Sequence, residues 1–286
     1  MIHPAVRDLF QSLSRQPAFQ ELAHAFAAGV GPEHATSLSG LTTTAKAIYI
    51  VLLRQATERP VLVLVDGNKQ AETYEELIGT FYEILISSRA SEAPQLIPAL
   101  DVLPAQKLSP HSEVSEERAI GLWRIATRGA PIVIASAGSA LLRTYSAEFY
   151  RQLPLLLRTG DELPVDDILA HLYNIGYERR EPVEMVGEYS LRGGILDVFP
   201  VQAEKPVRIE FFGDSIESMR RFDVESQRSV VKVQDCLLLP LIEEPRSRDL
   251  LREIAARLPE GAAVVPGETF PGWEFATPLV RTRTSS

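Results

Sequence analysis

The chain has 286 residues, 45% of them hydrophobic and 23% charged, and a formal net charge of -9. This composition is that of an ordinary globular protein, and it excludes intrinsic disorder, a collagen-like repeat and a disulfide scaffold. The acidic excess argues against tight, sequence-independent binding of nucleic acid by the whole chain. The single cysteine, Cys236, cannot form an internal disulfide, and the longest apolar runs, such as 48–53 and 61–65, are too short to span a membrane. With no secretory signal visible, we expect a cytoplasmic protein without a membrane partner.

The first half of the chain alternates between helical and strand patterns. Residues 1–36 carry apolar side chains at steps of three and four residues, which predicts amphipathic helices, and a loop at 37–47 leads into a further helix. The next predicted elements are strands at 60–65, 95–97 and 131–136 and helices at 71–86 and 112–127. The β-branched runs 60–65 and 131–136 are typical of strands buried on both faces. Strands that alternate with helices indicate an α/β layer with a parallel sheet.

From about residue 150 the pattern changes to that of a small α+β domain. A helix is expected at 164–175, and short β-type segments separated by turn residues follow it. These segments are 184–189, 194–199, 206–212, 215–222 and 229–239. A helix at 248–258 and a strand at 262–265 are expected after them. The last residues, 281–286, show no packing pattern.

A loop near the start of the chain has the spacing of a phosphate-binding Walker A loop, G-x-x-x-x-G-K-[ST]. It begins at Gly40, continues through Thr44 and keeps the lysine as Lys46, but Ala45 replaces the second glycine and Ala47 replaces the hydroxyl that holds Mg²⁺. We therefore expect no working ATPase site. The favoured alternative is a loop that enters a helix with Lys46 in solvent, and another is a decayed nucleotide site kept for its structure.

No other catalytic or metal-binding pattern is visible. The candidate metal ligands are His3, His24, His34, His111, His171 and Cys236. They have no ligand spacing among themselves, and Cys236 is expected to be a core residue of a strand. Asp66 follows a predicted strand, but it is not part of an acidic cluster of the Walker B kind.

The segment 206–212 has one apolar and one polar face if it is a strand, because successive side chains point to opposite sides. The apolar face carries Val207, Ile209 and Phe211. Arg208 and Phe212 share the other face, and an aromatic ring beside an arginine is typical of a protein-binding hot spot. The alternative is that Phe212 ends the strand and folds under the following turn. The alternation does not decide between the two.

Two runs of the second half resemble a known family. The run RGGILDVFP at 192–200 and the run from 208 to 228, which begins RIEFFGD, are similar to the second domain of the bacterial transcription-repair coupling factors. They resemble the corresponding domain of the excision-repair subunit UvrB more distantly. The segments ALDVLP at 99–104 and SPH at 109–111 resemble the first domain of these factors. The decayed loop at 40–47 lies where UvrB keeps an intact one.

The resemblance implies a fold and its division into domains. Residues 1–152 would form a RecA-like parallel α/β domain, related to P-loop NTPases but degenerate, and called domain 1a. Residues 153–240 would be an inserted small antiparallel α+β domain, domain 2, that docks UvrA. Residues 241–286 would begin the returning segment, domain 1b, and end in a flexible tail.

The same resemblance implies a function without catalysis. The chain would be an adaptor of nucleotide excision repair that recruits UvrA, and the alternative is an ATP- and DNA-binding repair protein like UvrB. No cofactor is expected, because ATP in the full-length family serves a motor that is not present here. DNA and RNA polymerase would be contacted only through family regions that are also not present. The chain would then be a fragment, a truncated gene product or a reduced paralogue that competes for UvrA.

The resemblance also implies which residues contact UvrA. They are an arginine after the Gly-Glu-Tyr turn, an arginine of the next strand and an aromatic residue four positions later, which here are Arg192, Arg208 and Phe212. Strand alternation supports Arg208 and Phe212, whereas Arg192 is placed by resemblance alone, because Gly193 and Gly194 make its direction uncertain. Arginine offers a bidentate pair to a carboxylate of the partner. We expect alanine at each of the three positions to weaken UvrA binding and to leave the fold intact.

Overall fold

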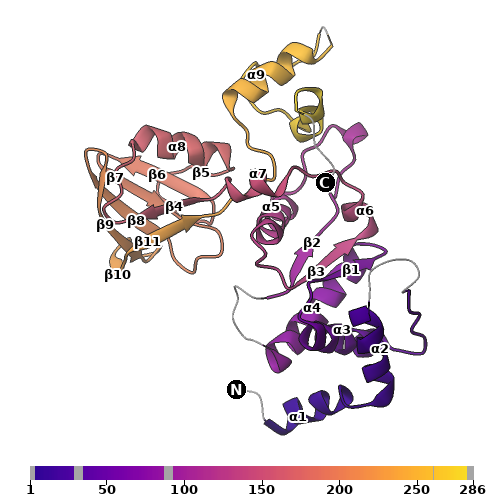
Figure 1. The fold of residues 1–286 in the computed structure, drawn as a ribbon. Coiled ribbons are helices and arrows are strands. Elements are labelled where there is room, and N and C mark those ends of the chain that lie inside the picture. The colour runs from indigo at the N-terminus through magenta and orange to yellow at the C-terminus, as the bar shows by residue number, and fades with distance from the viewer. Residues whose placement is uncertain (1–3, 29–34, 87–92, 260, 282–286) are drawn as a thin grey trace. The chain divides into compact units, whose positions relative to one another are not determined.

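The computed structural model describes residues 4–28, 35–86, 93–259 and 261–281 (Figure 1). The chain forms two compact units, which we describe separately. Unit 1 consists of Met1–Ala99 and Arg124–Leu142, and unit 2 of Leu100–Trp123 and Arg143–Ser286. In the described residues, no helix is both long and apolar enough to cross a bilayer.

Unit 1 is built on a parallel sheet of three described strands in the order β1-β3-β2. The strands are β1 (Val61–Val65), β2 (Gln95–Ile97) and β3 (Ile132–Ser136), and the helices are α1 (Pro4–Leu13), α2 (Pro17–Ala28), α3 (Thr43–Thr57), α4 (Asn68–Leu85) and α6 (Ala137–Ala140). The core of unit 1 joins α3 and α4 to one face of the sheet, with Val51, Ile78 and Ile134 among its fully buried members. The alternation of strands and helices predicted from the sequence is confirmed for this unit.

Burial on both faces is confirmed for β3 but is wrong for β1. The central strand β3 is almost fully buried. In β1 the side chains of Leu62 and Leu64 are 59% and 57% exposed. The strand lies at the edge of the sheet, and only its other face, with Val61, Val63 and Val65, joins the core. The other edge strand, β2, is buried, so the difference lies in what covers each face of a strand, and a β-branched run in the sequence does not reveal this.

Unit 2 is dominated by a sheet of six described strands in the order β10-β9-β8-β7-β6-β5. The strands are β5 (Glu178–Arg179), β6 (Glu188–Arg192), β7 (Ile195–Val198), β8 (Val207–Phe212), β9 (Ser215–Phe222) and β10 (Ser229–Val233). All neighbours are antiparallel except β5 and β6. One face of the sheet packs on α8 (Val165–Asn174) and on a second, two-stranded sheet of β4 (Leu155–Arg158) and β11 (Asp235–Leu238).

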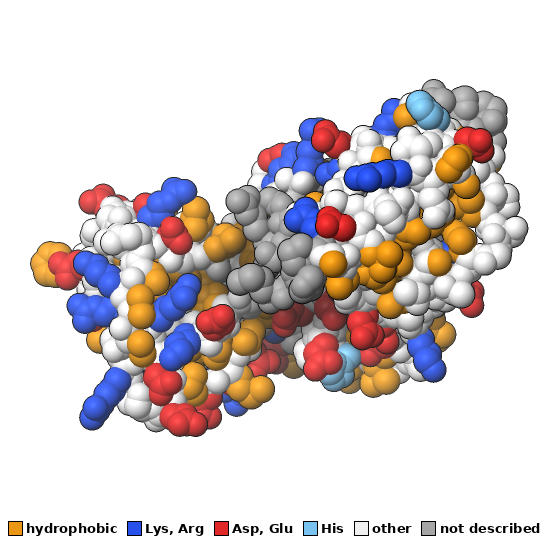
Figure 2. Space-filling model, turned by 90° about the horizontal axis from the view of Figure 1, so that it is seen from below, with side chains coloured by type: hydrophobic (Ala, Val, Ile, Leu, Met, Phe, Trp, Pro, Cys, Tyr) orange, Lys and Arg blue, Asp and Glu red, His pale blue; other side chains and the backbone are white. Residues whose placement is uncertain are grey.

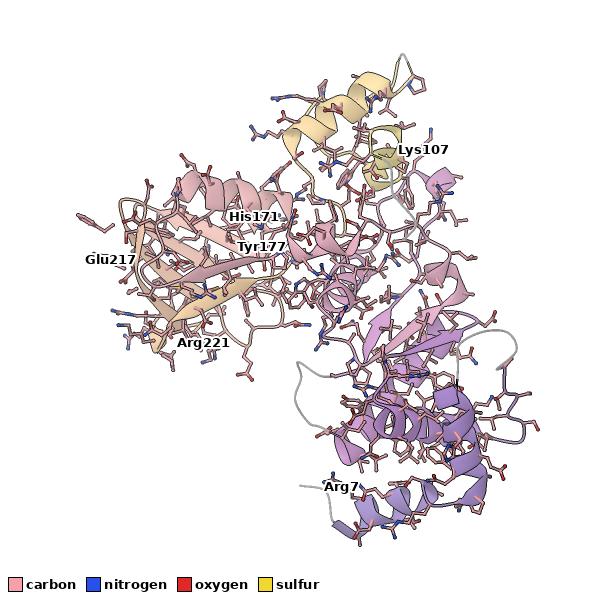
Figure 3. All side chains as sticks on the ribbon, in the orientation of Figure 1. Arg7, Lys107, His171, Tyr177, Glu217 and Arg221 are labelled. Carbon is pink, nitrogen blue, oxygen red and sulfur yellow. The ribbon has the colours of Figure 1, made fainter. Side chains whose placement is uncertain are left out.

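The phenol of Tyr177 is a polar group within the apolar core of unit 2. Tyr177 follows α8 and is fully buried. Its hydroxyl donates to the carbonyl of Leu239 at 3.2 Å and accepts from the N–H of Val201 at 3.4 Å (Figure 3). Burial raises the pKa of this phenol well above its ordinary value. Tyr177 thus fastens two connecting segments to the core of the small domain.

Three predicted strands differ from the structure. The segment 229–239 is two strands, because the chain leaves the large sheet after β10 and β11 pairs with β4 instead. The strand expected at 184–189 begins only at Glu188, whose carboxylate accepts the N–H groups of Glu184 and Met185 at 2.9 Å each and holds them in a turn. No strand forms at 262–265, all of which are described.

The remaining elements of unit 2 are η3 (Pro104–Gln106), α5 (Ser112–Ala126), which ends in unit 1, α7 (Ala147–Arg151), α9 (Arg248–Arg257) and η4 (Trp273–Leu279). Buried charged side chains connect α5 and the segments that flank α7, α9 and η4. The buried guanidinium of Arg118 donates to Glu243 at 2.9 Å. The buried carboxylate of Glu244 accepts from the Tyr145 hydroxyl at 2.6 Å and from Arg281 at 3.0 Å. Arg281, expected to lie in an unpacked tail, therefore has a partner, whereas residues 282–286 lie outside the described part.

Candidate functional site

The loop with Walker A spacing enters a capped helix. Thr42 is the N-cap of α3, and its hydroxyl accepts the N–H of Ala45 at 3.2 Å. A phosphate-binding loop would direct such N–H groups at the ligand. Residues 35–42, which include the first part of the loop, form no strand, whereas a Walker A loop connects a strand to a helix.

Side chains of this loop and of the first turn of α3 lie either in the core of unit 1 or on its surface. Ala47, at the position of the Mg²⁺-binding hydroxyl, is fully buried in the core of unit 1. Lys46 and Thr44 are exposed on the first turn of α3, and Gly40 has a positive φ of 77° in the preceding loop. The expected loop-to-helix transition with an exposed lysine is confirmed.

The second face of the large sheet carries the predicted docking residues. The register pairs Asp197 of β7 with Arg208 of β8, and Arg208 with Arg220 of β9. A neighbouring row pairs Arg192 with Ile195, and Ile195 with Glu210. We call this surface the polar face and define it by Arg192, Asp197, Arg208, Glu210, Phe212, Arg220 and Lys232. It lies opposite the face that packs on α8.

A buried carboxylate organises the polar face. The side chain of Asp197 is only 3% exposed. Its Oδ1 accepts from Arg208 Nε at 2.7 Å, and its Oδ2 accepts from Arg208 Nη2 at 2.8 Å and from Arg192 Nη2 at 3.2 Å. Bidentate charge-assisted bonds of this kind are the strong ones. The sequence did not identify Asp197 as a site residue, because its contact with Arg208 depends on the register of β7 and β8.

Arg208 is committed to its own chain. Its side chain is 17% exposed, its Nη1 donates to the carbonyl of Gln227 at 3.2 Å, and its guanidinium lies 4.6 Å from the ring centre of Phe222. The hydrogen bond with Asp197 raises the pKa of Arg208 further. The bidentate pair expected to face a partner is therefore made within the chain. From this geometry we expect alanine at this position to destabilise the fold, unlike the expectation from the sequence.

Arg192 and Phe212 lie at the same end of the face, and both side chains are at least half exposed. The register places Arg192 on the polar face, where its half-exposed guanidinium also lies 3.7 Å from Glu181. Gly194, in the turn that follows, has no room for a side chain, because a Cβ there would lie 2.9 Å from the carbonyl oxygen of Phe211. The ring of Phe212 is 77% exposed, so it does not fold under the turn.

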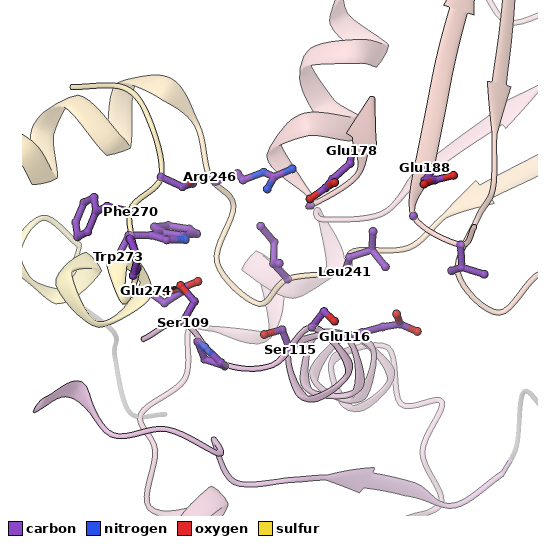
Figure 4. Close-up of a pocket in the computed structure, with 18 of the residues that line it drawn as sticks. Ser109, Ser115, Glu116, Glu178, Glu188, Leu241, Arg246, Phe270, Trp273 and Glu274 are labelled. Carbon is purple, nitrogen blue, oxygen red and sulfur yellow. Dashed lines mark hydrogen bonds between the residues drawn. The ribbon is translucent and has the colours of Figure 1, made fainter. Parts of the chain in front are cut away.

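A separate cavity of about 770 Å³ lies within unit 2 (Figure 4). Four segments meet there, at 109–116, 176–188, 241–246 and 269–274. Trp273 and Phe270 form an aromatic wall, and the Arg246 guanidinium donates to two backbone carbonyls at 2.9 Å each (Figure 4). Burial raises the pKa of the Glu116 and Glu274 carboxyls. The described lining contains no histidine or cysteine, so it offers no nucleophile–base pair of the serine–histidine kind.

The candidate metal ligands that the structure describes do not come together. No group of three His, Cys, Asp or Glu residues capable of holding a metal occurs in the part of the chain that the structure describes. His3 and His34 lie outside that part. Cys236 is buried in β11, and burial raises the pKa of its thiol to about 12. It is a core residue, as expected.

A comparison with known protein families finds a match within unit 2. Residues 155–243 match the model of the UvrB interaction domain. This range includes both sheets of unit 2 and every residue of the polar face.

Over most of its length the chain is also similar to transcription-repair-coupling factors. It is 34% identical over 265 residues to the factor of Mycobacterium tuberculosis, which covers 88% of this chain and 20% of the relative. It is 28% identical over 211 residues to the factor of Escherichia coli (74% and 18%) and 27% over 193 residues to that of Bacillus subtilis (68% and 16%). The chain thus spans about a fifth of the length of these relatives. The resemblance inferred from the sequence is confirmed: the chain is a relative of the transcription-repair-coupling factors and contains a UvrB interaction domain.

Proposed function

We propose that the chain recruits the excision-repair subunit UvrA through the polar face of unit 2, as a non-catalytic adaptor of nucleotide excision repair. The observation that carries the proposal is Phe212, an exposed aromatic ring on the same face as the half-exposed Arg192, within the UvrB interaction domain. Aromatic and arginine side chains dominate the energetics of protein interfaces. A large ring left in solvent is a cost that a partner would remove.

In this proposal Arg192, Arg208 and Phe212 have different roles. Phe212 is the apolar anchor, and Arg192 is the cation that can turn from Asp197 and Glu181 to a carboxylate of UvrA. Arg208 holds Asp197 and thereby keeps the strands β7 and β8 and the position of Arg192 fixed. Arg208 is thus a positioning residue whose truncation acts on folding as well as on binding.

The proposed architecture follows the same resemblance. Residues 1–152 would form a degenerate RecA-like domain 1a, into which residues 153–240 are inserted as domain 2, and residues 241–286 would begin domain 1b. The parallel sheet of unit 1 supports the first part. The compact units group residues 100–123 with unit 2, so the domain bounds rest on the resemblance alone. A cytoplasmic location, and contacts with DNA and RNA polymerase through other regions of the family, belong to the proposal as well.

A UvrB-like ATP- and DNA-binding function has less support. The buried Ala47 offers no ligand to Mg²⁺, and the N–H of Ala45 is already bound by Thr42. The net charge of -9 opposes a polyanionic ligand.

Biolayer interferometry with purified UvrA tests the proposal. We expect the wild-type chain to bind and Phe212→Ala to weaken binding at least about tenfold, since an aromatic anchor contributes about 2 kcal/mol or more. The control is Leu237→Ala, which removes an exposed apolar side chain from the same domain outside the polar face. Absence of wild-type binding, or equal effects of the two variants in folded protein, would refute the proposal.

A further inference from the structure

Two more cations stand on the polar face beside Arg208. The register pairs Arg208 with Arg220 on β9, and Arg220 with Lys232 on β10. Residues directly opposite each other on antiparallel strands have Cβ atoms about 4.5–5.5 Å apart and point to the same side. Asp197, Arg208, Arg220 and Lys232 therefore form one row across four strands.

No carboxylate of the described residues neutralises the charge at the β9–β10 end of this row. Asp197 is buried and already paired with Arg208 and Arg192. Arg220 and Lys232 are both exposed, and neither forms an ion pair with a carboxylate of the described residues. Like charges directly opposite each other destabilise a sheet. The arrangement therefore has a cost for folding that an anionic partner would relieve.

The surroundings favour protein carboxylates over a nucleic-acid backbone as that partner. Lys and Arg side chains are prominent on unit 2 in the view of Figure 2, but Asp and Glu side chains lie among them. On the polar face itself Glu210 follows Arg208 by two residues and is partly exposed. Such a mixed surface repels a uniform polyanion and suits a protein surface with its own pattern of charges.

We infer that Arg220 and Lys232 extend the docking face as far as β10 and receive a cluster of carboxylates on the partner protein. The inference rests on the proposed function, because Phe212 and Arg192 lie on the same face. It adds a second contact region to that function, one that sets the electrostatic steering and the salt dependence of docking.

The chain offers a matched control for the test. Arg221 is the next residue of β9, is also exposed and carries the same charge, but the register pairs it with Val207 and therefore places it on the other face. Binding to UvrA is measured by biolayer interferometry at about 0.05 M and 0.3 M salt, with circular dichroism to confirm folding. We expect Arg220→Ala and Lys232→Ala to weaken binding about threefold to tenfold, and Arg220→Glu to weaken it more. Arg221→Ala should change it less than about twofold, Arg220→Lys should retain most of the affinity, and the double alanine variant should show a smaller salt dependence.

The outcomes separate the inference from the proposed function. If the wild-type chain does not bind UvrA, the proposed function fails and the inference falls with it. If Phe212→Ala weakens binding but Arg220→Ala and Arg221→Ala behave alike, the inference is wrong and the proposed function stands. A fluorescein-labelled 20-base-pair duplex is the second probe. Binding of that duplex at about 0.15 M salt, lost in Arg220→Ala, would overturn the assignment to protein carboxylates.

Discussion

Removal of the Arg208 charge is expected to destabilise unit 2, because the buried carboxylate of Asp197 then loses its main charge partner. Asp197 is 3% exposed and receives two of its three arginine hydrogen bonds from Arg208. Breaking a buried ion pair from one side costs about 3–5 kcal/mol. Because Arg192 still reaches Oδ2, the lower end applies, and Arg208→Met should lower the free energy of unfolding by about 3 kcal/mol.

The same reasoning predicts that the second partner can be removed at little further cost. Asp197→Leu leaves Arg208 with the Gln227 carbonyl and the Phe222 ring, and should cost about 2 kcal/mol. The double variant contains no buried unpaired charge, so it should be more stable than the sum of the single effects implies, by about 2 kcal/mol. This coupling distinguishes a buried pair from two independent packing contacts.

Urea unfolding followed by tryptophan fluorescence gives the measurement. Trp123 and Trp273 are the two tryptophans of the chain, and both belong to unit 2. The control is Arg221→Met, an exposed arginine on the adjacent strand whose loss should change stability by less than about 0.5 kcal/mol. Additive effects of Arg208→Met and Asp197→Leu, or an Arg208 variant as stable as the control, would refute the assignment of Asp197 as a buried, charge-paired group.

Three further predictions follow from the fold. Val207→Ala should lower the free energy of unfolding by about 1–3 kcal/mol, because it leaves a cavity under the sheet, and a thermal melt unchanged within about 1 °C would contradict this. The chain should show no Mg²⁺-dependent ATP binding by calorimetry, since Ala45 and Ala47 occupy the critical loop positions, and a micromolar site lost in Lys46→Ala would prove this wrong. Glu274→Gln should raise the melting temperature at pH 7 but not near pH 4. Because the folded-state pKa of Glu274 is raised, its ionisation at higher pH costs stability that the amide does not lose, and an equal effect at both pH values would count against that cause.

The sequence predicted local patterns better than their surroundings. The alternation in 206–212 correctly separated Val207 from Arg208 and Phe212, because strand geometry fixes the side of each residue. The substitutions at positions 45 and 47 likewise argued against a nucleotide site from the residues alone. The same kind of pattern failed at β1, where Leu62 and Leu64 are exposed, since burial of a strand depends on what lies beside the sheet.

What the sequence determined by itself was the family, the order of most helices and strands and the polar side of β8. The tertiary structure alone decided how the polar side chains share their charges. Asp197 and Arg208 are eleven residues apart, and only the pairing of β7 with β8 brings them together. That pairing engages the guanidinium of Arg208 within the chain. The pairing of β7 with β8 cannot be predicted from the sequence alone, because the register of a sheet is set by packing of the whole core rather than by any one segment.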